Sequence, residues 1–311
     1  TRKLLSAVPR VDKKVDLLVT DEQNSNTEVT DVGSKPPSSN ETIISIKELH
    51  VEFGKRKGIF SSIKEITKAV NGVSLELYRG EVLGLVGQSG SGKSTLIRSI
   101  AGLIQSKSGS IYYDNKDILQ ANPKELHAIR RKMQMIFQDP YGSLNPRFVA
   151  GRIIAEPLIN YGLMSNKDAF KKVQELMELV QLNPAWMNRY PHEFSGGQRQ
   201  RISIARALAL EPEILLCDEP VSALDVLIQA DVLNLLKEIR SRMDLTMLFV
   251  SHDLAVVRYI ADRVAVMNMG EIVELKPAAD IYLNAEHPYT QQLLDAIPIP
   301  DPSIEQKRIS C

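Results

Sequence analysis

One short segment, Gly87–Thr95, constrains the fold of this chain more than any other feature. It reads GQSGSGKST and matches the pattern G-x-x-x-x-G-K-[ST] of a phosphate-binding loop. The apolar run Val82–Val86 precedes it, and a helical pattern at Thr95–Leu103 follows it. A Gly/Ser-rich turn before a helix is the alternative, but strand, loop, Lys-Ser pair and helix occur together here. The segment, called the phosphate loop below, predicts a nucleoside triphosphate site.

The residues of the phosphate loop have separate expected roles. Its glycines permit backbone conformations that turn successive N–H groups toward a phosphate, and the N-terminus of the following helix adds a favourable dipole. Lys93 is expected to place positive charge on the β- and γ-phosphates, and the Ser94 hydroxyl to bind Mg²⁺. The residues expected to bind nucleotide are Gly87, Gln88, Ser89, Gly90, Ser91, Gly92, Lys93, Ser94 and Thr95.

A second apolar run, Ile214–Cys217, ends in two carboxylates, Asp218 and Glu219. A strand that is buried on both faces is continuously apolar, and ligands bind beyond the carboxyl ends of the strands in open α/β sheets. Asp218 is therefore placed for the Mg²⁺ shell, and Glu219 to orient or deprotonate the attacking water. An ordinary solvated loop is the alternative, and the phosphate loop upstream argues against it.

A third pattern, Phe194 followed by Ser195–Gln198, runs into an apolar helix. Serine is a favourable N-cap, and the two glycines after it expose backbone N–H groups at a helix start. The pattern predicts a second anion site formed by Ser195, Gly196, Gly197 and Gln198. An ordinary helix cap and turn is an equally good interpretation of this pattern taken alone.

The remaining sequence alternates strands with helices, which predicts an α/β fold with a largely parallel sheet. A mostly helical stretch, about residues 141–211, interrupts the alternation and predicts an inserted helical subdomain. Residues 54–68 are expected to form a basic loop. We expect strands at residues 44–53, 69–78, 110–113, 133–137, 214–217, 247–250 and 264–267, and helices at residues 169–181, 197–210 and 227–243.

The predicted domain occupies residues 43–280, with a polar, flexible linker at 16–42 and a C-terminal tail at 281–311. The segment Thr1–Pro9, TRKLLSAVP, resembles Thr290–Pro298, TQQLLDAIP. Coincidence in a short window is one explanation. The other is that residues 1–15 are the tail of a preceding copy, so that this chain is the C-terminal half of a tandem protein.

Composition limits the possible partners. The chain has 311 residues with 38 basic and 38 acidic side chains, so its net charge does not indicate nucleic acid as a partner. Two cysteines, Cys217 and Cys311, do not make a disulfide framework and favour a reducing compartment. No apolar run approaches the roughly 20 residues of a membrane-spanning helix.

The motifs, in this order and spacing, resemble the nucleotide-binding domains of ABC transporters over about Ile43–Pro302. The phosphate loop looks like the Walker A loop, and Ser195–Gln198 like the signature motif. An aromatic residue stacks on adenine in this family, and Phe53 aligns with it; a core-facing strand residue is the alternative. The other matching positions are Gln138 (Q-loop), Ile214–Asp218 (Walker B), Glu219 (catalytic glutamate), Asp225 (D-loop) and His252 (switch histidine).

The resemblance implies a P-loop fold with a RecA-like core, an antiparallel β part and a helical subdomain. It implies ATP hydrolysis with Mg²⁺ held by Ser94, Gln138 and Asp218. Catalysis would rest on Glu219, His252, Lys93 and Gln138. In this family two cassettes meet head to tail, each signature motif facing the nucleotide of the other, and Asp225 belongs to the same composite site. The second cassette is expected in the same polypeptide.

Three segments resemble the peptide/nickel branch of ABC importers: Met135–Pro140, Arg189–Phe194 and His287–Thr290. This branch implies a subunit that energises import of peptides or related small solutes at the cytoplasmic face of the inner membrane. Its partners would be membrane permease subunits, which meet the segment Asp139–Glu156, and indirectly a periplasmic or extracellular solute-binding protein. A soluble ABC ATPase of translation or DNA repair and a binding-only domain beside an active partner are the alternatives.

Overall fold

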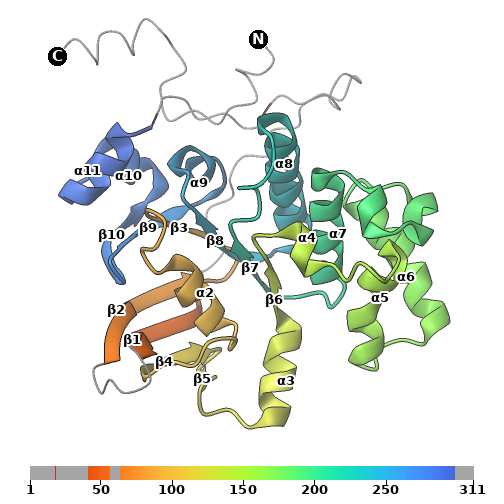
Figure 1. Ribbon diagram of the computed structural model, residues 1–311, viewed down its shortest axis with the longest axis horizontal. Coiled ribbons are helices and arrows are strands. Elements are labelled where there is room, and N and C mark those ends of the chain that lie inside the picture. Colours follow the sequence, from red (N-terminus) through yellow and green to blue (C-terminus); the bar gives the residue numbers. More distant parts are fainter. Residues whose placement is uncertain (1–17, 19–40, 57–63, 298–311) are drawn as a thin grey trace, which may run out of the picture. The chain divides into compact units, whose positions relative to one another are not determined.

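The computed structural model describes residue 18 and residues 41–56 and 64–297, in two compact units (Figure 1). Unit 1 contains Leu18 and Arg130–Met247, and unit 2 contains the other described residues. The expected tail at 1–15 lies outside the described residues, as does nearly all of the expected linker at 16–42. Within that linker Leu18 is buried, and its backbone N–H and C=O each bond the Asn234 side chain at 3.2 and 2.8 Å.

Unit 2 contains an antiparallel sheet with the strand order β2-β1-β4-β5. Its long strands β1 and β2 carry alternating apolar residues, which bury one face. The basic loop expected at residues 54–68 is wrong at both ends, because β1 and β2 stay paired there, for example at Gly54 opposite Ile66. The strands are β1 (Thr42–Arg56), β2 (Lys64–Tyr78), β4 (Ser108–Tyr113) and β5 (Lys116–Asp117).

Unit 2 also contains the strand that leads into the phosphate loop. This strand, β3, runs parallel to β9, which pairs antiparallel with β10. All five residues of β3 are buried, as its continuous apolar sequence predicts. The elements are β3 (Val82–Val86), α2 (Lys93–Ile100), α9 (Leu254–Ile260), β9 (Arg263–Asn268), β10 (Glu271–Pro277), α10 (Ala278–Leu283) and α11 (Pro288–Asp295).

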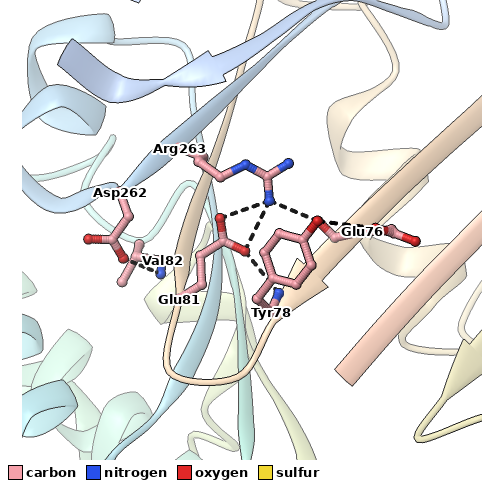
Figure 2. Close-up of polar contacts among 6 residues, drawn as sticks. All are labelled: Glu76, Tyr78, Glu81, Val82, Asp262 and Arg263. Carbon is pink, nitrogen blue, oxygen red and sulfur yellow. Dashed lines mark hydrogen bonds and ion pairs between the residues drawn. The ribbon is translucent and has the colours of Figure 1, made fainter. Parts of the chain in front are cut away.

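A polar cluster joins the start of β3 to the start of β9 (Figure 2). The fully buried Glu81 carboxylate contacts Arg263 Nη1 at 3.1 and 3.3 Å and accepts the Tyr78 N–H at 2.9 Å. Asp262 accepts the Val82 N–H at 2.8 Å. Burial raises the pKa of Glu81, although the bonds from Tyr78 and Arg263 act in the opposite direction. The cluster therefore fixes β3 against β9 at the end remote from the phosphate loop.

Unit 1 combines the parallel strand pair β6–β7 with a group of helices. Helices α5, α6 and α7 pack on one another, and α7 also contacts α8 (Figure 1). The elements are β6 (Met133–Ile136), α4 (Pro140–Ser143), α5 (Ala150–Asn160), α6 (Asn166–Leu179), η2 (Pro184–Asn188), η3 (Pro191–Glu193), α7 (Gly196–Leu208), β7 (Ile214–Asp218) and α8 (Val226–Met243). Two elements contain residues of both units, α3 (Pro123–Lys132) and β8 (Thr246–Ser251).

The expected P-loop α/β fold with an antiparallel β part and a helical subdomain is confirmed. The sequence patterns did not predict α3, α5, α9, α10, α11, β5 and β10. Strand β10 has only one buried residue, and α11 has eight residues, so neither carries a long periodic pattern. None of the helices in the described part of the chain is long and apolar enough to cross a membrane.

Candidate nucleotide site

The phosphate loop adopts a conformation that two of its glycines make possible. Gly92 caps helix α2 with a φ of 108°, which L side chains rarely adopt. A Cβ atom at Gly92 would lie 2.1 Å from the Ala69 carbonyl oxygen, and one at Gly87 would lie 2.2 Å from that of Met267. The loop therefore fits between strands β2 and β9 only with glycine at these two positions.

Lys93 is buried inside the loop, with 4% of its surface exposed. Its ammonium group donates to the carbonyl oxygens of Gly87 and Gln88 at 2.7 and 2.9 Å. These bonds hold the ammonium group within the loop, while the tip residues Ser89 and Gly90 are exposed. The charge that the sequence assigned to phosphate binding thus lies within the phosphate loop.

The N–H of Gln88 donates to the hydroxyl of Tyr289 on α11 at 2.9 Å. Tyr289 is not among the site residues that the sequence predicted. The segment His287–Thr290 was used only for its resemblance to the peptide/nickel branch. This resemblance was the signal in the sequence that could have drawn attention to Tyr289, because no role had been predicted for the residues of the segment.

In unit 1 the carboxyl end of β7 brings together three of the predicted residues. Asp218 is fully buried, and Glu219 follows it with a φ of 48°, an uncommon conformation for a non-glycine residue. Gln138 donates its side-chain amide to Glu219 Oε2 at 3.3 Å. The amide N–H of Gln138 therefore faces Glu219, which leaves its amide oxygen as the atom suited to a cation.

The predicted signature residues form the start of helix α7. Ser195 caps the helix by accepting the Gln198 N–H at 3.3 Å, and Gln198 accepts the Ser195 N–H at 3.0 Å in return. Ser195 and Gly196 are exposed, whereas Gly197 is buried. A Cβ atom at Gly197 would lie 2.3 Å from Ile228 Cγ2, so this glycine serves close packing of α7 on α8. Part of the pattern is thus structural, and its exposed part is the helix N-terminus.

The three remaining predicted residues lie at separate places. Asp225 caps α8 by accepting the Ile228 N–H at 3.1 Å. His252 is exposed just before α9, between Ser251 and the helix cap Asp253. Phe53 in β1 is 45% exposed, so the alternative of a core-facing strand residue is wrong. Unit 2 therefore contains the phosphate loop, Phe53 and His252, and unit 1 contains the other predicted residues.

Two family models match this chain. One, described as ABC transporter, matches residues 70–222, and the other, described as oligopeptide/dipeptide transporter, C-terminal region, matches residues 273–310. The oligopeptide transport ATP-binding protein OppF of Escherichia coli K12 is 51% identical over 262 residues, which cover 84% of this chain and 78% of that protein. This chain belongs to the ATP-binding proteins of ABC transporters. It is an ATPase of the kind that couples ATP hydrolysis to transport.

Other members of the family agree with this assignment. OppF of Bacillus subtilis 168 is 50% identical over 271 residues, covering 86% of this chain and 87% of that protein. A dimeric structure of the ATP-binding cassette MJ0796, in a post-hydrolysis state with ADP and Pi, superposes with a TM-score of 0.67 at 32% identity. It covers 76% of this chain and 98% of that cassette.

The lengths of these relatives contradict the expected tandem arrangement. The matching residues make up 78% and 87% of the two OppF proteins, which leaves no room in them for a second cassette. These relatives therefore hold one cassette per chain, contrary to the expectation that the second cassette shares this polypeptide. The segment Thr1–Pro9, on which that expectation rested, lies outside the described residues.

Proposed function

We propose that this ABC ATPase energises the import of oligopeptides through a membrane transporter. The proposal rests on two separate matches to proteins of peptide transport. The chain is about half identical to oligopeptide transport ATP-binding proteins, and its C-terminal residues 273–310 match a region described for oligopeptide and dipeptide transporters. The second match lies beyond the part that all ABC cassettes share, so it supports the peptide branch in particular.

Three residues are proposed to hold Mg²⁺ with the nucleotide: Ser94, Gln138 and Asp218. They offer a hydroxyl, an amide oxygen and a carboxylate, which are the hard oxygen donors that Mg²⁺ prefers together with water and phosphate oxygens. The Gln138 contact with Glu219 supports this choice, because it leaves the amide oxygen for a cation. The ion would neutralise charge on the transferred phosphate.

The protein groups are proposed to position water and phosphate. Phosphoryl transfer needs little covalent chemistry from the protein, so catalysis is mainly positioning and charge stabilisation. Glu219, next to Gln138, would orient the attacking water, and His252 would contact the γ-phosphate. Lys93 would exchange its carbonyl contacts for phosphate oxygens. Phe53, exposed on β1, is proposed to stack on adenine.

A second cassette is proposed to complete the site, because Ser195 and Gly196 form an exposed helix N-terminus. Such a terminus suits the γ-phosphate of a nucleotide bound by another cassette. Membrane permease subunits would contact the segment Asp139–Glu156, where Tyr141 is 61% exposed, and a solute-binding protein would deliver the peptide. We propose that the chain works at the cytoplasmic face of the inner membrane.

The Glu219→Gln variant tests this function. In a reconstituted transporter, it should lose oligopeptide-stimulated ATP hydrolysis by at least about 100-fold, while the affinity for ATP stays within about twofold. ATPase assays with and without a peptide-loaded binding protein, and nucleotide titrations, measure the two quantities. Unchanged hydrolysis would refute the role of Glu219, and wild-type activity that oligopeptides do not stimulate would refute the proposed substrate class.

A further inference from the structure

One contact between the C-terminal region and the phosphate loop has no part in the proposed mechanism. Tyr289 stands 201 residues after Gln88, and its hydroxyl accepts the backbone N–H of that residue at 2.9 Å. Gln88 itself is exposed and is the second residue of the phosphate loop. Tyr289 is half-buried in the first turn of α11, so this bond connects a C-terminal helix directly to the nucleotide site.

Helix α11 is held firmly enough to carry such a contact. His287 caps it by accepting the Tyr289 N–H at its Nδ1 atom, 3.1 Å away. Glu274 of β10 accepts the N–H groups of Glu286 and His287 at 2.9 and 3.1 Å. Thr290, in the same turn, is fully buried. The segment His287–Thr290 thus sets both the start of the helix and the direction of its tyrosine.

The charge of Glu274 is stable in this arrangement. Burial by itself raises the pKa of its carboxyl group. Hydrogen bonds from the N–H groups of Glu286 and His287 and from the ammonium of Lys276 have the larger, opposite effect and lower the pKa to about 2. Lys276 Nζ lies 3.2 Å from Glu274 Oε1. Because the carboxylate stays ionised at neutral pH, it binds the start of α11 with charge-assisted hydrogen bonds, which are stronger than neutral ones.

The phosphate loop is also held on its other side. The Ser91 carbonyl oxygen accepts the N–H of Gly270, in the turn between β9 and β10, at 2.9 Å. The tip between these two supports is open, since nothing lies within 4 Å of a Cβ atom built at Gly90. Contacts from the C-terminal part of the chain therefore hold the loop before its tip, at Gln88, and after its tip, at Ser91.

We infer that Tyr289 is a positioning residue for the phosphate loop, and that the C-terminal region it belongs to tunes the affinity for nucleotide. The inference rests on the proposed use of this loop for ATP. A glycine-rich loop loses much conformational freedom when it closes around a phosphate. Bonds that order the loop before the nucleotide arrives remove part of that entropic cost, so they strengthen binding without touching the ligand.

The Tyr289→Phe variant tests this, because it removes the hydroxyl and keeps the ring. We expect the dissociation constant for a fluorescent ATP analogue with Mg²⁺ to rise about 2- to 10-fold, the range that one hydrogen bond supplies. At saturating ATP, turnover of the assembled transporter should stay within about twofold of wild type. The matched control is Tyr78→Phe, whose hydroxyl donates to Glu76 Oε2 at 3.2 Å in the same unit, near the end of β3 that is remote from the loop.

A second variant, Glu274→Ala, approaches the same loop through the helix. It removes the acceptor of the two N–H groups that hold the start of α11, so it should weaken ATP binding with Tyr289 still present. The double variant should bind ATP with about the affinity of whichever single variant binds it more weakly, since both changes break the same connection. Effects that multiply would mean that Glu274 and Tyr289 act independently, which would overturn the inference.

The outcomes separate this inference from the proposed function. An unchanged dissociation constant in Tyr289→Phe, with the wild-type chain binding ATP normally, would overturn the positioning role alone. A lower melting temperature without a change in affinity would show a purely structural tyrosine and would also overturn it. Failure of the wild-type chain to bind ATP would instead overturn the function of the phosphate loop.

Discussion

Replacing Gly197 with alanine tests whether this signature glycine serves packing. The added Cβ atom would lie 2.3 Å from Ile228 Cγ2, far inside van der Waals contact. Ile228 is β-branched and sits on helix α8, so its Cγ2 cannot swing away without a change of rotamer. Helices α7 and α8 must then separate. Gly196 provides the matched control, because a Cβ atom there would meet only Leu224 Cδ2, at 3.7 Å.

The magnitude follows from two opposing terms. Overpacking by one methyl group in a well-packed contact costs about 1–3 kcal/mol. Replacing glycine by alanine in a helix gains up to about 1 kcal/mol, and less in the first turn. We expect Gly197→Ala to lower the free energy of unfolding by about 1–2 kcal/mol, and Gly196→Ala to change it by less than about 0.5 kcal/mol.

Urea denaturation of four chains provides the assay: wild type, Gly197→Ala, Ile228→Ala and the double variant. Truncating Ile228 removes the clash, so the double variant should be more stable than the sum of the single effects predicts, by at least about 1 kcal/mol. Additive effects, or a Gly197→Ala chain as stable as wild type, would refute the packing argument. Gly197 would then have to be explained by nucleotide contact alone.

Two further predictions concern buried carboxylates in unit 2. Arg263→Met leaves the buried Glu81 without its cation and should cost about 3 kcal/mol of unfolding free energy. Because the pKa of Glu81 is already raised and should rise further, the loss should be larger at pH 8 than at pH 5 in urea titrations; a pH-independent loss would contradict this. Glu274→Ala should cost up to about 3 kcal/mol at pH 7, because its pKa of about 2 lies below the unfolded value. That difference should shrink as the pH falls from about 4.5 toward 2, and a constant difference would exclude the assigned ionisation.

The sequence by itself determined the fold class and the chemistry of the phosphate loop. Backbone geometry explains why, since the pattern of glycines and Lys93 in the loop is tied to one local conformation. Strand β3 shows the same dependence: a continuous apolar run of five residues predicts a strand buried on both faces, and all five are buried. Local rules of this kind act over a few residues, so they can be applied without knowing the tertiary structure.

Some predicted site residues have structural roles that the sequence did not indicate. The sequence assigned Gly197 and Asp225 to nucleotide binding, and the structure shows one packing against Ile228 and the other capping α8. A helix start that faces a ligand needs caps and close packing as well as exposed N–H groups, and a pattern of letters does not separate these demands. The choice between an exposed and a core-facing Phe53 was likewise undecided until its surroundings were known.

Only the tertiary structure decided which distant residues meet. Glu81 with Arg263 and Gln88 with Tyr289 are pairs separated by 182 and 201 residues. No local periodicity connects them, because such contacts depend on how strands β3, β9 and β10 align and where α11 docks beside them. The sequence could therefore predict that this chain binds and hydrolyses ATP, whereas the C-terminal support of its phosphate loop emerged only from the folded chain.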